Sequence, residues 1–256
     1  VHAAALLSEA EAAGVDLLQL GRAGALPFDA LVIAAWAAPR TSRIGIIATV
    51  SAKLSHPFHV ARALSGIDML CDGRSGWCPI AGGAPAGMAE DMVNAARSLW
   101  DGWSADTLII DKASGRYLDT TKVKPSNYAG PFFKVHGPVN AMRPPQGHPL
   151  LVCDSAQALA LSGVDVALVS DGESRPSALR HLLKCGLDAD PGQLAARFAA
   201  GELDGVHFDL VDAATDLGVI AERFSALAGK QAAGATLRER LGLQLETTLQ
   251  MQGALA

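Results

Sequence analysis

Clustered positive charge and abundant cysteine are both missing from this sequence. Its 256 residues carry 21 Lys and Arg against 26 Asp and Glu, a formal charge of −5. Non-specific nucleic-acid binding needs clustered Lys and Arg to displace counterions, so the charge argues against a nucleic-acid partner. The four cysteines form no CxxC pair and lie near no histidine cluster at ligand spacing: Cys71, Cys78, Cys153 and Cys185. We therefore expect buried free thiols in the reducing cytoplasm rather than disulfides.

Long apolar runs are absent as well. No run reaches the roughly 18 residues that a membrane span requires, so we expect no membrane partner. The N-terminal stretch VHAAALLSEAEAAG lacks the basic region of a secretory signal and is typical of an amphipathic helix. Because the chain starts on this helix, without Met and not on a strand, it hints at an upstream segment that is missing or was never present.

Motifs for several kinds of catalysis are also lacking. AGGAPAG is rich in glycine but does not satisfy GxGxxG, so a dinucleotide fingerprint is absent. The glycines around Ser75 lack the GxSxG spacing of a serine hydrolase. His56 and His59 lie close together at the start of a predicted helix, but no third ligand is evident, so we predict no metal site. A structural role in its loop is the main interpretation for His56, and a pocket role is the alternative.

The first part of the chain alternates between helix-forming and strand-forming segments. Helices are expected over residues 3–13, 27–38, 56–73 and 89–103. Strands are expected over residues 15–20, 43–50 and 76–83. Gly14 and the Asp72–Gly73 pair are helix stop signals, and Pro57 fits the first turn of a helix. The alternation predicts a parallel sheet with helical crossovers.

The second part is less regular. Residues 106–146 are rich in Gly, Pro, Asn and Lys, and this length predicts an excursion with its own hairpins. Further strands are expected over residues 148–155 and 164–170, with a helix between them, and over 203–210. Residues 177–200 and 220–243 are expected to be broadly helical. A closed barrel needs about eight strands and these patterns give about six, so either strands lie within the irregular segments or the barrel is incomplete.

Several segments, read in order, resemble one enzyme family. They are PRTSRIGIIATVS, HPFHVAR, DMLCDGRSGW, LWDGWSAD, GRYLDTTKVKPSNYAGPFFKVHGPVNAMRPPQGHP and GATLRERLGL. The chain resembles the bacterial-luciferase-like, flavin-dependent monooxygenases, and within them the nitrilotriacetate and dibenzothiophene-sulfone monooxygenase branch. The resemblance covers nearly the whole chain and implies an α/β fold of the TIM (β/α)8 type, shortened or incomplete. It implies a single domain over residues 1–256, with an insertion at about 106–146.

The resemblance further implies a two-component monooxygenase. Reduced FMN would come from a separate flavin reductase, and O2 would serve as co-substrate in oxygenating a small organic molecule. Members of the superfamily commonly dimerise through helices near residues 27–38. That segment is apolar on nearly every face, so a homodimer is expected. No side chain can be nominated as a catalytic base.

The active site of such a barrel lies at the carboxyl ends of its strands. The candidate flavin contacts follow three predicted strands: Ala48, Thr49, Ser51, Cys78, Asp154, Ser155, Ala156 and Gln157. The alternative for Thr49 and Ser51 is that they only end a strand and cap the next helix.

Several residues depart from the pattern of the branch. Cys78 stands where the branch has a flavin-contacting Asn, and a thiol hydrogen-bonds poorly. The phosphate-binding turn reads CDSAQ, so Asp154 would bring a carboxylate close to a phosphate dianion. The pocket segment after Gly83 is reduced to APAGM, and a strand expected after residues 164–170 is missing.

Two main hypotheses follow from these matches and departures. The first is an FMN-dependent monooxygenase. The second is a degenerate, non-catalytic paralogue that acts as a flavin-binding or protein-interaction subunit. A barrel that uses a deazaflavin is a third option.

Overall fold

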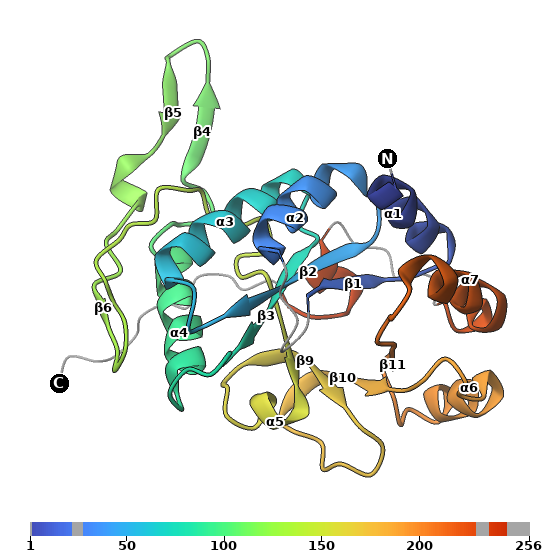
Figure 1. Cartoon of the computed structure of the whole chain (residues 1–256). Coiled ribbons are helices and arrows are strands. Elements are labelled where there is room, and N and C mark those ends of the chain that lie inside the picture. The colour runs from blue at the N-terminus through green and yellow to red at the C-terminus, as the bar shows by residue number, and fades with distance from the viewer. Residues whose placement is uncertain (1, 22–27, 229–235, 245–256) are drawn as a thin grey trace.

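Seven parallel strands build the central sheet of the computed structural model, which describes residues 2–21, 28–228 and 236–244 (Figure 1). Across the sheet they are β1 (Leu17–Leu20), β2 (Gly45–Ser51), β3 (Ser75–Ile80), β8 (Leu150–Asp154), β9 (Val164–Val169), β10 (Ala178–Lys184) and β11 (Gly205–His207). Every neighbouring pair is parallel. The spatial order follows the chain without a reversal, which is the order of a (β/α) barrel and not of a doubly wound sheet.

The sheet curls, and within the described residues its two edges are β1 and β11. A closed barrel of this type has about eight strands. The architecture is therefore a shortened TIM-type barrel, and the predicted fold class is confirmed.

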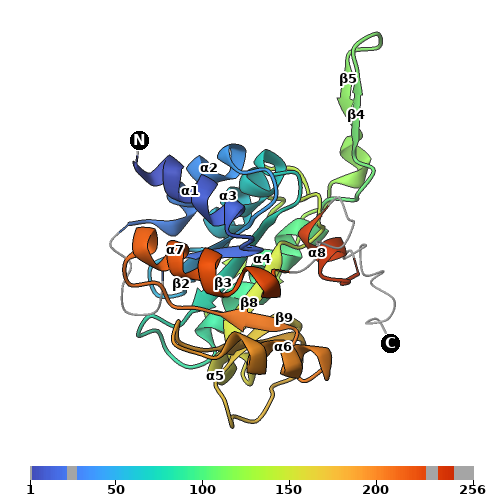
Figure 2. The same ribbon diagram turned by 90° about the vertical axis from the view of Figure 1, so that its right-hand side faces the viewer.

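Helices cover the outer side of the sheet (Figures 1 and 2). In chain order they are α1 (His2–Ala12), α2 (Ala30–Ala37) with η1 (Ala38–Arg40), α3 (Pro57–Leu70), α4 (Met88–Asp101), α5 (Ser155–Ala158), α6 (Pro191–Ala199) and α7 (Ala213–Arg223) with η3 (Ser225–Leu227). The side chains of Asp29, Asp190 and Asp212 accept backbone N–H groups and so fix the starts of α2, α6 and α7. His56 caps α3, because its Nδ1 accepts from the N–H of Phe58 at 3.3 Å, which supports the structural interpretation of this histidine.

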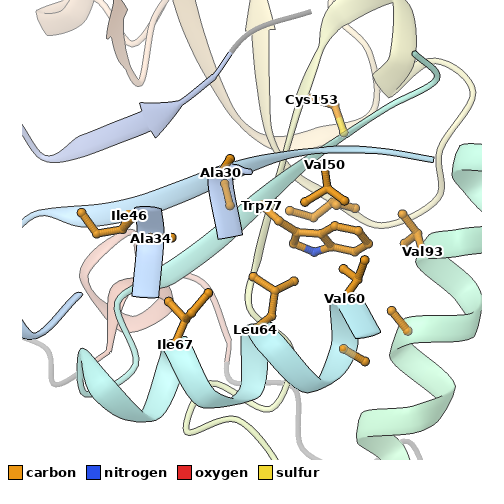
Figure 3. Packing of buried hydrophobic residues seen from close by; sticks show 14 of the residues in the cluster. Ala30, Ala34, Ile46, Val50, Val60, Leu64, Ile67, Trp77, Val93 and Cys153 are labelled. Atoms are coloured by element: carbon orange, nitrogen blue, oxygen red, sulfur yellow. The ribbon is translucent and has the colours of Figure 1, made fainter. Parts of the chain in front are cut away.

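A large apolar core lies between the sheet and the helices (Figure 3). Trp77 of β3 is buried in this core beside Val60 and Leu64 of α3. Its ring meets Trp100 of α4 edge to face, with 6.2 Å between ring centroids. Trp100 also donates its Nε1–H to the carbonyl of Ala61 at 3.1 Å. These contacts fix α3 and α4 against the strands whose ends form the barrel mouth.

A second apolar cluster fills the inside of the barrel. Ile47, Leu150 and Val166 belong to it, together with Leu237 of α8 (Leu237–Arg240). The N–H of Leu237 donates to the carbonyl of Gly73, just before β3, at 2.8 Å. α8 therefore closes the amino end of the barrel and leaves the carboxyl end open. It belongs to the GATLRERLGL motif, of which residues 234–235 lie outside the described part of the chain.

A buried ion pair fastens α8 to the barrel. Arg238 Nη1 lies 2.8 Å from Asp165 Oδ2 in β9, and both side chains are almost wholly buried. The same Asp165 oxygen accepts from the N–H of Leu151 at 2.8 Å. Removing one member of such a pair leaves an uncompensated buried charge, so the contact holds α8 in one position.

Asp68 and Arg74 hold together the turn between α3 and β3. Asp68 Oδ1 accepts from the N–H and the hydroxyl of Ser75, at 3.1 and 2.8 Å, and from Gln146 Nε2 at 2.7 Å. Arg74 donates to the carbonyl of Ile44 at 2.6 Å. Burial raises the pKa of Asp68, although its hydrogen bonds from Ser75 and Gln146 act in the opposite direction.

Residues 106–146 contain two hairpins, as the sequence predicts for this segment. β4 (Leu108–Asp111) pairs with β5 (Arg116–Leu118), then comes η2 (Thr120–Lys122), and β6 (Tyr128–Ala129) pairs with β7 (Lys134–Val135). The second hairpin is held on α4, because Asp91 accepts the N–H groups of Phe132 and Phe133, both at 2.8 Å. The β4–β5 hairpin instead projects away from the barrel (Figures 1 and 2).

The prediction of helix over residues 177–200 is wrong in its first half. The segment ALRHLLK forms β10, in which Arg180 and Leu182 lie beside Val166 and Leu168 of β9. The strand predicted to be missing after residues 164–170 is therefore present, and the sheet has seven strands rather than six. β10 is only partly buried, so polar residues interrupt the apolar run that usually marks a parallel strand.

The prediction of helix over residues 220–243 is also inaccurate. α7 begins earlier, at Ala213, and ends at Arg223, and a separate short helix follows as α8. Residues 229–235 lie outside the described part of the chain. Asp212 sets the earlier start because its carboxylate accepts the N–H groups of Ala214 and Thr215.

Candidate functional site

The carboxyl ends of the strands surround a cavity of about 160 Å³, which we call the mouth cavity. Its lining residues are Gln19, Cys78, Ile80, Asp154, Leu168, Lys184, His207 and Asp209. They come from the ends of β1, β3, β8, β9, β10 and β11, with Asp209 just beyond the last strand. This is the end of a (β/α) barrel at which active sites lie.

An ion pair joins two walls of the mouth cavity. Lys184 Nζ, at the end of β10, lies 3.1 Å from Asp154 Oδ1, at the end of β8. Burial acts to lower the pKa of Lys184, but the hydrogen bond and the charge of Asp154 outweigh it and raise this pKa. Lys184 therefore stays cationic and faces the carboxylate across the intervening strand β9.

Acidic groups outnumber basic ones around this pair. His207 Nε2 lies 3.5 Å from Asp209 Oδ1 on the β11 side of the mouth cavity. Glu173, which follows β9, accepts hydrogen bonds from Ser155 and from the N–H of Ser170.

Cys78 points into the barrel, where the sequence predicts a flavin contact. It belongs to the inner apolar cluster, while its neighbour Trp77 belongs to the outer one. Burial raises the pKa of the Cys78 thiol to about 12, and the charge of Asp154 acts in the same direction. The thiol is therefore protonated near neutral pH and is a poor nucleophile and a poor hydrogen-bond partner.

Thr49 and Ser51 lie on the inward face of β2, two and four residues after the inward-facing Ile47. Thr49 Oγ1 accepts from Gln19 Nε2 at 3.1 Å and donates to the carbonyl of Gly21 at 2.8 Å, so this hydroxyl is already engaged. Ser51 Oγ is buried and has no hydrogen-bond partner among the described residues.

Ala48 is the predicted site residue that faces away from the mouth cavity. Its side chain belongs to the outer core between sheet and helices, because neighbouring residues of a strand point to opposite faces. Only its backbone is left to contribute to a ligand site.

Ser155, Ala156 and Gln157 begin the short helix α5, directly after Asp154. The Ser155 hydroxyl donates to Glu173 Oε2 at 2.6 Å, so it is occupied by an acidic partner. Ala156 is exposed, and Gln157 Oε1 is buried without a partner among the described residues. The structure thus brings the predicted residues other than Ala48 to one end of the barrel, and their assignment to a flavin stays a prediction.

Comparison with known proteins decides the family. Residues 2–169 match the luciferase-like monooxygenase family, which is more than half of the chain. The chain belongs to this family.

Two relatives support the predicted branch and differ in how they align. The dibenzothiophene-sulfone monooxygenase of Rhodococcus erythropolis is 31% identical over 150 residues, which are 52% of this chain and 33% of that protein. A pristinamycin IIA synthase subunit of Streptomyces pristinaespiralis is 32% identical over 242 residues, which are 91% of this chain and 86% of that protein. The chain thus spans about a third or less of several monooxygenases that it matches, but most of the length of the synthase subunit.

A solved structure supports the fold. The EDTA monooxygenase of Chelativorans sp. BNC1 superposes with a TM-score of 0.74 at 17% identity, over 96% of this chain and 92% of that chain. At this identity the likeness describes the fold alone.

The described mouth does not fit the flavin of a luciferase-like monooxygenase. Ligand pockets commonly measure about 300–1,000 Å³, and the mouth cavity measures about 160 Å³. Among the described residues, the carboxylates of Asp154, Asp209 and Glu173 all act on Lys184, so the charge near this lysine is mainly negative, which is unfavourable for a phosphate dianion. Ser51 Oγ and Gln157 Oε1 are buried and unpaired among the described residues, so they leave some capacity for a polar ligand, but they cannot offset the small volume and the acidic charge.

The sequence prediction missed six of the mouth residues, the apolar Ile80 and Leu168 and four polar ones: Gln19, Lys184, His207 and Asp209. Lys184 was missed because its segment was assigned to a helix. Gln19 carried a usable signal, since it is a polar side chain within the apolar run VDLLQL, one position before the end of β1.

Metal centres and membrane spans are two other features to consider in the described part of the chain. These residues contain no group of three or more His, Cys, Asp or Glu side chains arranged to hold a metal ion. No helix within the same residues is long and apolar enough to cross a bilayer.

Proposed function

We propose that this chain is a subunit of a flavin-dependent, luciferase-like monooxygenase and pairs with a flavin-binding barrel instead of holding flavin in its own mouth. The observation that carries this proposal is the mouth cavity, which is small, acidic and crossed by the Asp154–Lys184 ion pair. The alternative, a monooxygenase with its own flavin, would need this pair to separate and the cavity to enlarge.

The share of each relative's length that this chain matches supports a subunit role. One relative that this chain matches over most of both lengths is named as a subunit of a synthase. Three relatives named as a monooxygenase or a monooxygenase component are matched over about a third of their length or less. In the proposed assembly, reduced FMN from a separate flavin reductase, O2 and a small organic substrate would meet on the partner barrel, in the cytoplasm.

The exposed side of α2 is the proposed pairing surface. Phe28 precedes the helix, next to its N-cap Asp29, and Val32 and Trp36 lie one turn apart on one face of it. Phe28, Val32 and Trp36 are 71%, 67% and 37% exposed, while Ala30, Ala34 and Ala37 are buried against the barrel. An exposed apolar stripe of this kind marks an interaction site. In the isolated chain we expect it to pair with a second copy, which gives the homodimer that the sequence predicts.

Titration of the isolated chain with FMN tests the central part of this proposal. We expect no saturable binding of oxidised or photoreduced FMN at about 100 μM, a concentration that detects affinities as weak as about −5 to −6 kcal/mol. The readouts are flavin fluorescence and anaerobic difference spectra. Riboflavin serves as the control without a phosphate, and we expect it to be excluded as well, because the cavity is too small for the ring system. Saturable binding of reduced FMN would contradict the proposal and restore the enzyme hypothesis.

A further inference from the structure

A second cavity, of about 360 Å³, lies at the amino end of the barrel, and we call it the amino-end cavity. Leu17, the first residue of β1, and Arg240, the last residue of α8, both line it. It has more than twice the volume of the mouth cavity, and it falls within the range that is common for ligand pockets. This end of the barrel therefore has room for a small organic molecule.

Apolar side chains form most of the wall of the amino-end cavity: Leu17, Val166, Leu182, Phe198, Leu203 and Leu241. Phe198, near the end of α6, is 55% exposed, so much of its ring is in contact with water. Burying apolar surface is favourable, and such a wall suits the hydrocarbon part of a ligand.

Arg180 is held in place by the backbone around the amino-end cavity. Its Nε donates to the carbonyl of Leu241 at 3.0 Å, and its Nη1 donates to the carbonyl of Leu179 at 3.2 Å. Its Nη2 donates to none of the described residues. A group that is already oriented loses less freedom when a ligand binds, so Arg180 is prepared to receive an acceptor.

Asp204 is the carboxylate among the lining residues, and it engages Arg180 only loosely. Its Oδ1 lies 3.7 Å from Arg180 Nη1, and both side chains of this pair are 36% exposed. Its Oδ2 accepts instead from the N–H of His181 at 2.8 Å. Exposed ion pairs of this kind contribute little, whereas a ligand carboxylate can form two parallel hydrogen bonds with a guanidinium group. A bound carboxylate can therefore compete with Asp204 for Arg180.

Arg240 brings a second guanidinium group to the same cavity. Its Nη1 donates to the carbonyl of Arg43 at 2.7 Å. Burial lowers the pKa of Arg240, and the charges of Arg74 and Arg43 act in the same direction, against that of Asp16. An arginine stays charged near neutral pH. A bound anion would relieve the repulsion between these like charges.

We propose that the amino-end cavity binds a monocarboxylate that carries an apolar chain or ring. The carboxylate lies beside Arg180 and Arg240, and the apolar part packs on the leucines and on Phe198. A guanidinium group suits this ligand because its planar fork matches the two oxygens of a carboxylate. The site lies at the opposite end of the barrel from the mouth cavity, so it does not depend on whether the mouth holds flavin.

Isothermal titration calorimetry of the full chain with 4-phenylbutyrate tests this site. The alcohol 4-phenylbutan-1-ol keeps the apolar part without the charge, and acetate keeps the charge without the apolar part. We expect saturable 1:1 binding of 4-phenylbutyrate with a dissociation constant on the order of 100 μM, and binding of the other two that is weaker by about tenfold or more. Binding should weaken as NaCl is raised from about 50 to 500 mM, because Arg180 and Arg240 are partly exposed.

Variants of the two arginines assign the binding to this cavity. Arg180→Gln and Arg240→Gln should each raise the dissociation constant about tenfold or more. Arg240→Lys keeps the charge without the planar fork, and its affinity should lie between those of Arg240→Gln and the unaltered chain. Arg116→Gln is the matched control, since Arg116 is an exposed arginine of β5 outside the cavity, and it should bind like the unaltered chain. Circular dichroism and thermal unfolding check that each variant folds.

Hydrogen–deuterium exchange on the unaltered chain gives a readout that needs no variant. With 4-phenylbutyrate present, we expect slower exchange for the amides of residues 178–182 and 237–243. No binding at about 5 mM, equal binding of the alcohol, or arginine variants that bind as tightly as the unaltered chain would overturn the proposal. Loss of binding through Lys184→Gln, with both arginine variants unaffected, would place the carboxylate in the mouth cavity and would overturn it as well.

Discussion

At the residue scale, the surroundings of each buried polar group indicate whether it stabilises the fold or could take part in chemistry. Cys78 points into the mouth cavity, but its raised pKa keeps the thiol protonated. Asp154, which the CDSAQ turn predicts to repel a phosphate, is held by Lys184 at the same end of the barrel. Asp68 and Arg74 hold together the turn between α3 and β3.

The sequence could locate these residues because strand ends are readable from apolar runs and turn signals. It could not supply their partners. Lys184 lies 30 residues from Asp154, and their contact depends on β8, β9 and β10 being neighbours. The direction in which Ala48 points was also hidden, since a one-residue shift in register exchanges the two faces of a strand.

Asp101 allows a prediction about pH. Burial acts to raise its pKa, but hydrogen bonds from His148 at 2.9 Å and Arg143 at 3.0 Å outweigh this and lower it. A carboxyl group whose pKa is lower in the folded than in the unfolded state stabilises the fold at pH values above its unfolded pKa, which is about 3.9 for Asp. This stabilisation is lost as the pH falls from that value through the lower pKa of the folded state. We expect Asp101→Asn to reduce the free energy of unfolding at pH 6, and the difference from the unaltered chain to shrink below about pH 4.

Urea denaturation at a series of pH values measures this difference. The remaining carboxyl groups are common to both proteins, so their own titration largely cancels. A gap between Asp101→Asn and the unaltered chain that stays constant down to pH 3 would show that the Asp101 charge does not stabilise the fold.

At the element scale, the two ends of the barrel differ: α8 closes the amino end, and the mouth cavity lies at the carboxyl end. The GATLRERLGL motif carries α8, which closes the amino end through Leu237 and Arg238. Its capping box, between Thr236 and Glu239, is readable in the sequence. The position of α8 at the amino end of the barrel cannot be read from the sequence, because it depends on a contact between Arg238 and Asp165, which are 73 residues apart.

The helix α8 gives a prediction about stability. Arg238→Met removes the cation and leaves Asp165 buried without its charge partner, which should lower the free energy of unfolding by about 3–5 kcal/mol. The double variant Arg238→Met with Asp165→Asn should recover part of this loss, because the amide oxygen of the Asn can still accept from the N–H of Leu151.

Urea unfolding at pH 7 provides the measurement, and Arg197→Met is the matched control. Arg197 makes solvent-exposed ion pairs with Asp171 at 3.1 Å and Glu202 at 3.3 Å, so its loss should cost much less than the loss of Arg238. Equal losses for the two single variants would mean that α8 is not fastened by this pair.

Secondary structure could be predicted where the apolar pattern is strong. The prediction failed where tertiary contacts determine which segment forms a strand. β2, β3, β8 and β9 are almost continuously buried and were recognised from their apolar runs. β10 lies between β9 and the short edge strand β11, so its side chains are mostly half exposed and its sequence mixes Arg180, His181 and Lys184 with leucines. Only its pairing with β9 and β11 makes it a strand.

At the scale of the whole molecule, the chain is a shortened luciferase-like barrel with a small mouth cavity at its carboxyl end. The family and the fold class were predictable because ordered motifs extend along nearly the entire sequence. The volume of the mouth cavity was not predictable, because it depends on how side chains from the ends of β8, β10 and β11 meet: Asp154, Lys184, His207 and Asp209. The exposed apolar side chains of α2, Val32 and Trp36, form part of the surface through which we propose that the chain pairs.

The measurement that tests flavin exclusion most directly is the reoxidation of photoreduced FMN by O2, followed by absorbance with and without an excess of the isolated chain. If the mouth does not hold flavin, the two time courses coincide at every protein concentration. A reoxidation rate that changes with added chain and then saturates would show that reduced FMN binds, and it would contradict the subunit role proposed for this protein.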